Sequence, residues 1–147
     1  MPGVIDTNLL LYAANQDADE HGAAVAFLEA MTTSRAAWFF TEGIVYEFLR
    51  VATHARVFPK PLMWKQALEF LQPLLGNEQF HVLVAGERHW TLLSDVLAET
   101  VHPSGNLFFD VRTVVLMREH GVRRIYTTDT DFLQFRDIEV VNPLLQA

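Results

Sequence analysis

Four acidic residues have sequence surroundings that are unusual for a solvated carboxylate. Asp6 and Asp129 each follow a short, mainly apolar and β-branched stretch, so each is expected just after a buried strand. Glu47 and Asp110 lie among apolar residues at helical spacing and share a helix face with them. A carboxylate in such a place is costly unless it is protonated, paired or bound to a metal ion. All four residues therefore call for a partner.

The two helical acids leave one alternative open. Their apolar neighbours at helical spacing are Ile44 and Val51 for Glu47, and Leu107, Val114 and Met117 for Asp110. Arg50 and Arg112 are close enough in sequence to pair with these two carboxylates and neutralise them. The strand-end acids have their own alternative, because an aspartate in that position often caps a helix or forms a turn. The same holds for Asp131, which can cap the short turn after it.

A divalent cation is the partner that suits all four carboxylates together. Clustered carboxylate oxygens favour the hard cations Mg²⁺ and Mn²⁺. Cysteine is absent, and the six histidines show no metal-ligand spacing, so we expect them to be surface or packing residues. The only lysines, Lys60 and Lys65, are too few to neutralise the cluster. The sequence therefore predicts an oxygen-ligated metal site.

Strands and helices alternate along the chain and must position these acids. Strands are expected at residues 4–5, 37–41, 80–84, 124–127 and 138–141, and helices after Asn8, at 42–54, 62–75 and 107–119. Another helix is expected after an acidic first turn (Asp17, Asp19, Glu20), and one more with Trp90, Leu93 and Leu97 on its inner face. Pro73 is expected to end or kink its helix early. This alternation indicates a three-layer α/β fold with a parallel sheet, in which ligands bind at the carboxyl ends of the strands.

Composition restricts the class of protein. A chain of 147 residues with 50% hydrophobic residues fits one domain, residues 1–147. The net charge of −7 argues against a broad basic face that coats nucleic acid, but it is compatible with a carboxylate-rich nuclease site. No apolar run is long enough for a membrane span, so we expect a cytoplasmic protein that does not bind membranes.

Several short motifs, in order, resemble the VapC-type PIN domains of toxin–antitoxin pairs. They are VIDTNLLLYA from Val4, VYEFLRVATHARVFPKPL from Val45, GNLFFD ending at Asp110, REHGV ending at Val122 and TTDTDF from Thr127. The resemblance implies a PIN fold with a five-stranded parallel sheet. It also implies that Asp6, Glu47, Asp110 and Asp129 are the catalytic residues and hold Mg²⁺ or Mn²⁺. Asn8 and Thr128 match accessory polar positions, and Asp131 matches an additional acid. Many relatives have Asp-Ala-His where this chain has Asp110-Val111-Arg112, which affects substrate contacts rather than the reaction.

The resemblance also implies a function. We expect an endoribonuclease toxin that hydrolyses RNA with metal-activated water. Its partners would be the RNA substrate, a VapB-type antitoxin on a separate chain and a second copy in a homodimer. Arg50, Arg56 and Arg112 are candidates for RNA contacts.

Two other functions use an acidic strand end. Phosphatases that form an aspartyl-phosphate have Asp-x-Asp after the first strand, whereas this chain has Asn8 at the second position, and its lysines are far from any expected strand end. A degenerate PIN domain or a receiver-like domain would use the acidic pocket for binding without nuclease activity. A degenerate domain would have lost one of the four acids, and all four are present.

Overall fold

A five-stranded parallel sheet runs through the middle of the protein. The structure is a computed structural model that describes residues 2–145. Its strands are β1 (Gly3–Ile5), β2 (Trp38–Thr41), β3 (Phe80–Leu83), β4 (Arg124–Tyr126) and β5 (Glu139–Val141). They lie in the order β3-β2-β1-β4-β5, and every pair is parallel. The predicted parallel sheet is confirmed.

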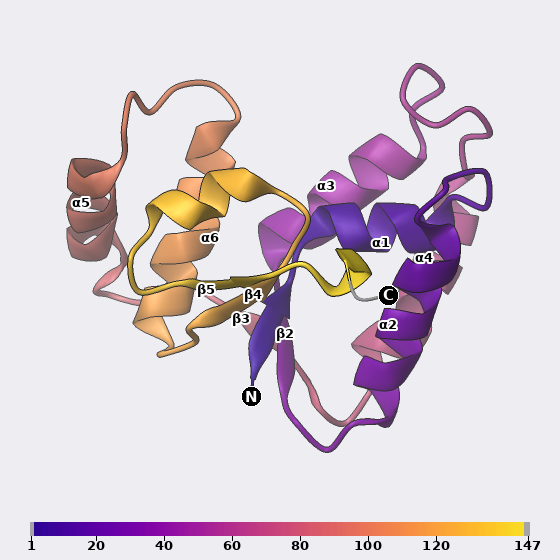
Figure 1. Ribbon diagram of the computed structural model, residues 1–147, viewed down its shortest axis with the longest axis horizontal. Coiled ribbons are helices and arrows are strands. Elements are labelled where there is room, and N and C mark those ends of the chain that lie inside the picture. Colours follow the sequence, from indigo (N-terminus) through magenta and orange to yellow (C-terminus); the bar gives the residue numbers. More distant parts are fainter. Residues whose placement is uncertain (1, 146–147) are drawn as a thin grey trace.

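Helices cover both faces of this sheet. The helices are α1 (Thr7–Ala14), α2 (His21–Thr33), α3 (Glu42–Ala52), α4 (Trp64–Leu75), α5 (His89–Glu99) and α6 (Leu107–Glu119). Figure 1 shows α5 and α6 on one side of the sheet and α1, α2 and α4 on the other, while α3 packs against α1. The three-layer α/β fold predicted from the alternation of patterns is therefore confirmed.

The central strands are apolar because both of their faces are covered. All three residues of β1 are buried, and so are Ile125 and Tyr126 of β4. Helix α6 lies so deep that six of its residues are buried: Val111, Thr113, Val114, Val115, Leu116 and Met117. Buried parallel strands favour such continuous apolar segments over alternating ones. The polar residues that follow these strands are consequently confined to the edge of the core.

The carboxyl ends of β1 and β4 lie on either side of the point where the strand order reverses. The chain passes from β1 to β2 and β3 in one direction, then returns to place β4 on the other side of β1. Ile5 pairs with Tyr126, and the Asp6 backbone N–H donates to the Tyr126 carbonyl at 3.0 Å. In open α/β sheets the crevice at this reversal is the usual place for a ligand. The fold therefore places Asp6 and the residues after Tyr126 at that crevice.

Several predicted boundaries differ from the structure by one or two residues, and three differences concern α2, α3 and α4. Helix α4 continues to Leu75, so the expectation that Pro73 ends it early is wrong. Proline in the last turn removes a single N–H donor, and the Gly76 N–H still bonds the Gln72 carbonyl at 2.9 Å. Helix α3 ends at Ala52, two residues before the predicted end. Residues 17–20, expected in the first turn of α2, precede that helix.

The predicted inner face of α5 is also partly wrong. Trp90 is 73% exposed, whereas His89 and Val96 are buried. The His89 imidazole contacts the Glu119 carboxylate of α6 at 2.5 Å, which directs His89 inward. Because consecutive helix residues are about 100° apart, Trp90 then points away from the core. Leu93 and Leu97 do pack against the core as predicted.

Candidate functional site

A cavity of about 650 Å³ opens between α3 and α6 at the carboxyl edge of the sheet. Its charged side chains include Glu47, Arg50, Asp110, Arg112, Asp129 and Asp131. The four carboxylates in this set come from α3, from α6 and from the segment after β4. The cavity therefore joins parts of the chain that are far apart in sequence.

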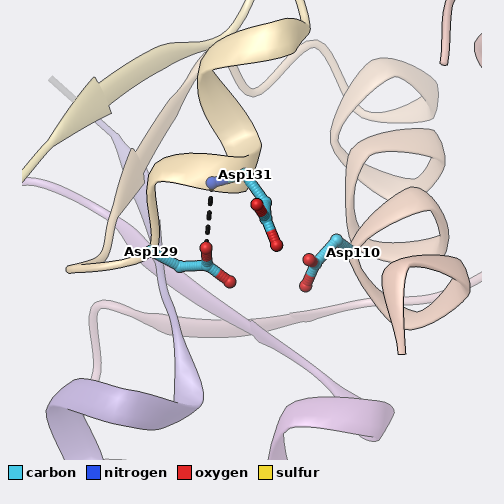
Figure 2. A group of neighbouring side chains, drawn as sticks. All are labelled: Asp110, Asp129 and Asp131. Atoms are coloured by element: carbon cyan, nitrogen blue, oxygen red, sulfur yellow. Dashed lines mark hydrogen bonds between the residues drawn. The ribbon is translucent and has the colours of Figure 1, made fainter. Parts of the chain in front are cut away.

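Three aspartates lie closest together in this cavity. Figure 2 shows the side chains of Asp110, Asp129 and Asp131 pointing toward one another, Asp110 from α6 and the other two from the segment after β4. One carboxylate oxygen from each lies within 4.8 Å of the other two. Asp129 begins a short 3₁₀ helix, Thr130–Gln134, and its Oδ1 accepts the Asp131 N–H at 2.9 Å. Asp129, rather than Asp131, is thus the residue that caps this turn.

Asp6 and Glu47 border a smaller recess beside the three aspartates. This recess measures about 20 Å³, which is room for one water molecule or ion, and Asp110 also lines it. Asp110 therefore belongs to both groups of acids. Each of the four acids singled out in the sequence thus lines the cavity, the recess or both, and Asp131 joins them in the cavity as a fifth carboxylate.

Asp6 is held by bonds to both of its carboxylate oxygens. Oδ1 accepts the Thr7 N–H at 2.9 Å at the start of α1, and Oδ2 accepts the Thr127 hydroxyl at 2.7 Å. The alternative that a strand-end aspartate caps a helix is therefore true of Asp6, as it is of Asp129. Capping does not remove either residue from the cluster of acids, because each side chain also faces its neighbours there.

Thr127 organises the polar residues behind the acids. Its buried hydroxyl donates to Asp6 and accepts from Asn8 Nδ2 at 3.1 Å and from the Asp129 N–H at 3.0 Å. Those three bonds use the full capacity of a hydroxyl group. Thr128, the accessory residue implied by the resemblance, contributes only its backbone N–H, to Asn8 at 3.4 Å. Only the pairing of Ile5 with Tyr126 in the structure places Thr127 opposite Asp6, so no sequence signal identifies Thr127.

Three of the acids, Asp6, Glu47 and Asp110, are held in an environment that disfavours their charge. Burial, and then repulsion from Asp129 and the other nearby acids, raises the pKa of Asp110 to about 7. Burial also raises the pKa of Asp6 and of Glu47, with Asp6 adding repulsion at Glu47. Among residues 2–145 none of these acids forms an ion pair within 4 Å, so the alternative that Arg50 or Arg112 pairs with Glu47 or Asp110 is wrong. The charge of Arg50 lowers the pKa of Glu47, but burial and the nearby acids outweigh this effect.

A sequence model of the PIN domain matches residues 3–138 of this chain. The chain belongs to the PIN-domain family. Two curated relatives from Mycobacterium tuberculosis place this PIN domain among the VapC ribonucleases: Ribonuclease VapC24, 32% identical over 95% of both chains, and Ribonuclease VapC33, 30% identical over 95% of this chain and 96% of the relative. The recognition made from the motifs is thereby confirmed.

Solved structures support the fold of this PIN domain at much lower identity. VapBC2 from Rickettsia felis, bound to a DNA fragment from its promoter, aligns with a TM-score of 0.68 at 14% identity over 97% of this chain and 98% of the other. The sarcin-ricin loop cleaving toxin VapC20 from Mycobacterium tuberculosis aligns with a TM-score of 0.66, also at 14% identity, over 95% and 99% of the two chains. At these identities the likeness concerns the fold alone.

The donor set of this PIN domain fits a hard divalent cation. Asp110, Asp129 and Asp131 supply closely spaced oxygens, and oxygen is the ligand that such cations prefer. The acids repel one another and, within residues 2–145, form no ion pair with a cationic side chain, so a bound metal ion would supply the missing positive charge. The acidic group can therefore hold a metal ion.

The candidate arginines divide into two groups. Arg50 and Arg112 line the cavity, whereas Arg56 lies beyond the end of α3 and is not among its lining residues. Arg112 sits over Gly43, where an added Cβ would collide with its Nη1. Glycine at this position leaves the space that the guanidinium occupies.

Among the described helices, none is long and apolar enough to cross a membrane.

Proposed function

We propose that this PIN domain, a single domain of residues 1–147, is the toxin of a toxin–antitoxin pair and acts in the cytoplasm as a metal-dependent endoribonuclease. The observation that carries the proposal is the convergence of five carboxylates, without a neutralising ion pair, at the strand-order reversal of the sheet. The similarity to VapC ribonucleases supports RNA as the substrate.

The side chains of the site have distinct roles in this proposal. Asp6, Glu47, Asp110 and Asp129 would hold Mg²⁺ or Mn²⁺, and Asp131 would add an oxygen beside Asp110 and Asp129. Such a cation supplies Lewis acidity, which lowers the pKa of an attacking water and offsets charge that develops on the phosphate.

The polar residues around the acids position them and the substrate. The Thr127 hydroxyl orients Asp6, and Asn8 fixes Thr127 in turn. Such outer contacts keep ligand oxygens in place. Arg50 and Arg112 lie where they can contact the phosphate groups of a bound RNA.

The phosphatase and receiver-like alternatives both require a lysine near the acids. Neither Lys60 nor Lys65 lines the cavity, and Lys60 lies 3.8 Å from Asp17 at the surface instead. No observation on the site favours either alternative over hydrolysis of RNA.

The acidic cavity also suggests how the protein would be inhibited. The Rickettsia felis neighbour was solved as the VapBC2 complex, and we propose a VapB-type antitoxin as the partner of this chain too. Because the cavity is acidic, the inhibiting side chain should be cationic, with arginine best suited to bridge two carboxylates. We propose a homodimer as the working assembly.

An RNA cleavage assay tests the proposed reaction. Purified protein, freed from any partner, should cleave RNA with Mg²⁺ or Mn²⁺ and leave 5′-phosphate and 3′-hydroxyl ends, because water is the nucleophile. A nuclease that uses the RNA 2′-hydroxyl would leave a cyclic phosphate. Cyclic phosphate products, or full activity in EDTA, would show that the proposed mechanism is wrong.

A further inference from the structure

One three-residue pattern occurs on both helices that line the acidic cavity. Each helix presents an aromatic ring, a carboxylate directly after it and a guanidinium two or three residues further on. The residues are Tyr46, Glu47 and Arg50 on α3, and Phe109, Asp110 and Arg112 on α6. All six line the cavity. The acids already have a role in the proposed function, whereas the two rings have none.

The rings lie at the rim of the cavity and not in the hydrophobic core. Tyr46 is 71% exposed and Phe109 is 62% exposed, while the acid after each ring is partly buried. This difference follows from the rotation of about 100° between consecutive helix residues. Neither ring contacts another aromatic ring or a cation among residues 2–145. Each ring is thus largely exposed and open to a ligand.

The arginines lie on the same helix faces as the rings. Arg50 is four residues after Tyr46, and Arg112 is three residues after Phe109, which makes each pair neighbours on its helix. Neither guanidinium forms an ion pair within 4 Å with a carboxylate of the described chain. Each helix therefore offers an unengaged group for a phosphate beside an unengaged ring for a base.

We propose that Tyr46 and Phe109 stack the bases of the two nucleotides that flank the scissile phosphate, and so select unpaired RNA. The carboxylates of the cavity would face the scissile phosphate, while Arg50 and Arg112 contact the neighbouring phosphates. Bases in a duplex are already stacked and paired, so they cannot reach the rings without being splayed out. This proposal rests on the proposed ribonuclease function and names the residues that choose its substrate.

A nucleic acid fits this rim better than a protein surface does. The cores of protein interfaces are depleted of charge. The rings here are instead surrounded by carboxylates and arginines, with Leu107 the one aliphatic side chain among the lining residues of the described chain. Charged groups interleaved with exposed rings are typical of single-strand binding surfaces.

Leucine substitutions at the rim test the proposal. A short single-stranded RNA that spans a cleavage site, mapped beforehand on total bacterial RNA, serves as the substrate. Tyr46→Leu and Phe109→Leu should each lower kcat/KM by roughly 5- to 150-fold, the range expected for stacking one base on one ring. Phe108→Leu is the matched control, because Phe108 is an exposed phenylalanine of the same helix that does not line the cavity. It should leave kcat/KM unchanged.

Abasic substrates show whether the rings act on bases. Removing the base on one side of the scissile phosphate should slow the wild-type protein by the same factor as the matching leucine variant. The matching leucine variant should cleave the abasic RNA as fast as it cleaves the intact RNA. The same RNA annealed to its complement should be a poor substrate. Additive losses for the abasic RNA and the variant, or equal cleavage of duplex and single strand, would overturn the proposal.

A binding measurement separates failure of stacking from failure of the ribonuclease function. An RNA with 2-aminopurine beside the scissile position, bound to the Asp110→Asn protein, should lose fluorescence through stacking, and the loss should disappear when Tyr46 or Phe109 is also leucine. Wild-type protein that never cleaves RNA would overturn the proposed function. Wild-type protein that cleaves while the leucine variants cleave equally well would overturn only the stacking role. Leucine variants that keep kcat/KM but no longer dimerise or bind a partner chain would assign the rings to a protein interface.

Discussion

At the scale of single residues, the Thr127 hydroxyl connects groups that the sequence pattern treats separately. Replacing it with Thr127→Val keeps the shape but leaves Asn8 Nδ2 and the Asp129 N–H without an acceptor, and Asp6 Oδ2 without its donor. We expect a loss of about 1–3 kcal/mol in the free energy of unfolding and weaker RNA cleavage. Thr128→Val is the control, because no bond to its side chain contributes to this network. Equal effects of both substitutions in melting and cleavage assays would contradict the assignment.

The raised pKa values predict how the metal-free protein responds to pH. The pKa of Asp110 rises from an ordinary 3.8 to about 7 in the folded chain, and those of Asp6 and Glu47 shift in the same direction. The folded state therefore binds these protons more tightly than the unfolded state. The contribution of Asp110 to stability should be fully present below about pH 4 and be lost as the pH rises through about 7, and Asp6 and Glu47 should add a fall in the same direction.

Thermal or urea unfolding in EDTA, repeated across this pH range, measures the effect. Saturating Mn²⁺ should reduce the fall, since the cation favours the charged carboxylates that high pH produces. Stability in EDTA that rises between about pH 5 and pH 7 would show that these acids are not the crowded, buried group described here.

The four main acids could be predicted from the sequence, whereas Thr127 could not. Acids that follow apolar strands or interrupt an apolar helix stripe stand out because their burial has a cost. A threonine at the end of a strand is ordinary in sequence, and only the pairing of β1 with β4 shows that it faces Asp6. The absence of ion pairs to Arg50 and Arg112 likewise depended on side-chain positions, which spacing does not determine.

At the scale of elements, two glycines provide a matched test of how α3 meets α6. Gly43 and Gly22 are each the second residue of a helix, but a Cβ would contact Arg112 only at Gly43. Alanine should favour either helix by up to about 1 kcal/mol. Gly43→Ala should also displace the Arg112 guanidinium and raise the KM for RNA, whereas Gly22→Ala should not. Melting curves and steady-state kinetics on both variants check this, and equal KM values for the two would contradict the role given to Gly43.

The bounds of a helix could be predicted where clear sequence signals mark both of its ends. The predicted helix 107–119 has the observed bounds of α6, because glycines or loop residues precede and follow it. The orientation of α5 was not predictable, since it depends on the contact between His89 and Glu119. Pro73 shows a similar limit, because its cost depends on how close it lies to the end of the helix.

At the scale of the whole molecule, the sequence predicted the three layers of the α/β fold and a site at the carboxyl edge of the sheet. The family match and the similar relatives then identified the chain as a VapC-type PIN domain.

If the proposed function holds, expression of this chain alone should arrest bacterial growth, and co-expression of its antitoxin should restore growth. The antitoxin should compete with RNA because both would occupy one acidic cavity. Growth curves check this, and RNA cleavage in cells that tolerate high levels of the chain without a partner would contradict the toxin role.

The central claim is that the converging carboxylates hold the catalytic metal, and Asp110→Asn tests it most directly. Asp110 belongs to both groups of acids, and unlike Asp6 it is not tied into the Thr127 network. Melting is measured at pH 8 in EDTA and in Mn²⁺, and RNA cleavage is measured in parallel. Asp95→Asn, at an exposed position of α5, is the control.

The free energy of unfolding of the wild-type protein should rise by about 2.7 kcal/mol when Mn²⁺ is present at a hundred times its dissociation constant. Asp110→Asn should melt at or above the wild-type temperature in EDTA, gain less from Mn²⁺ and lose cleavage. An Asp110→Asn protein that melts lower in EDTA and still cleaves RNA would contradict the account.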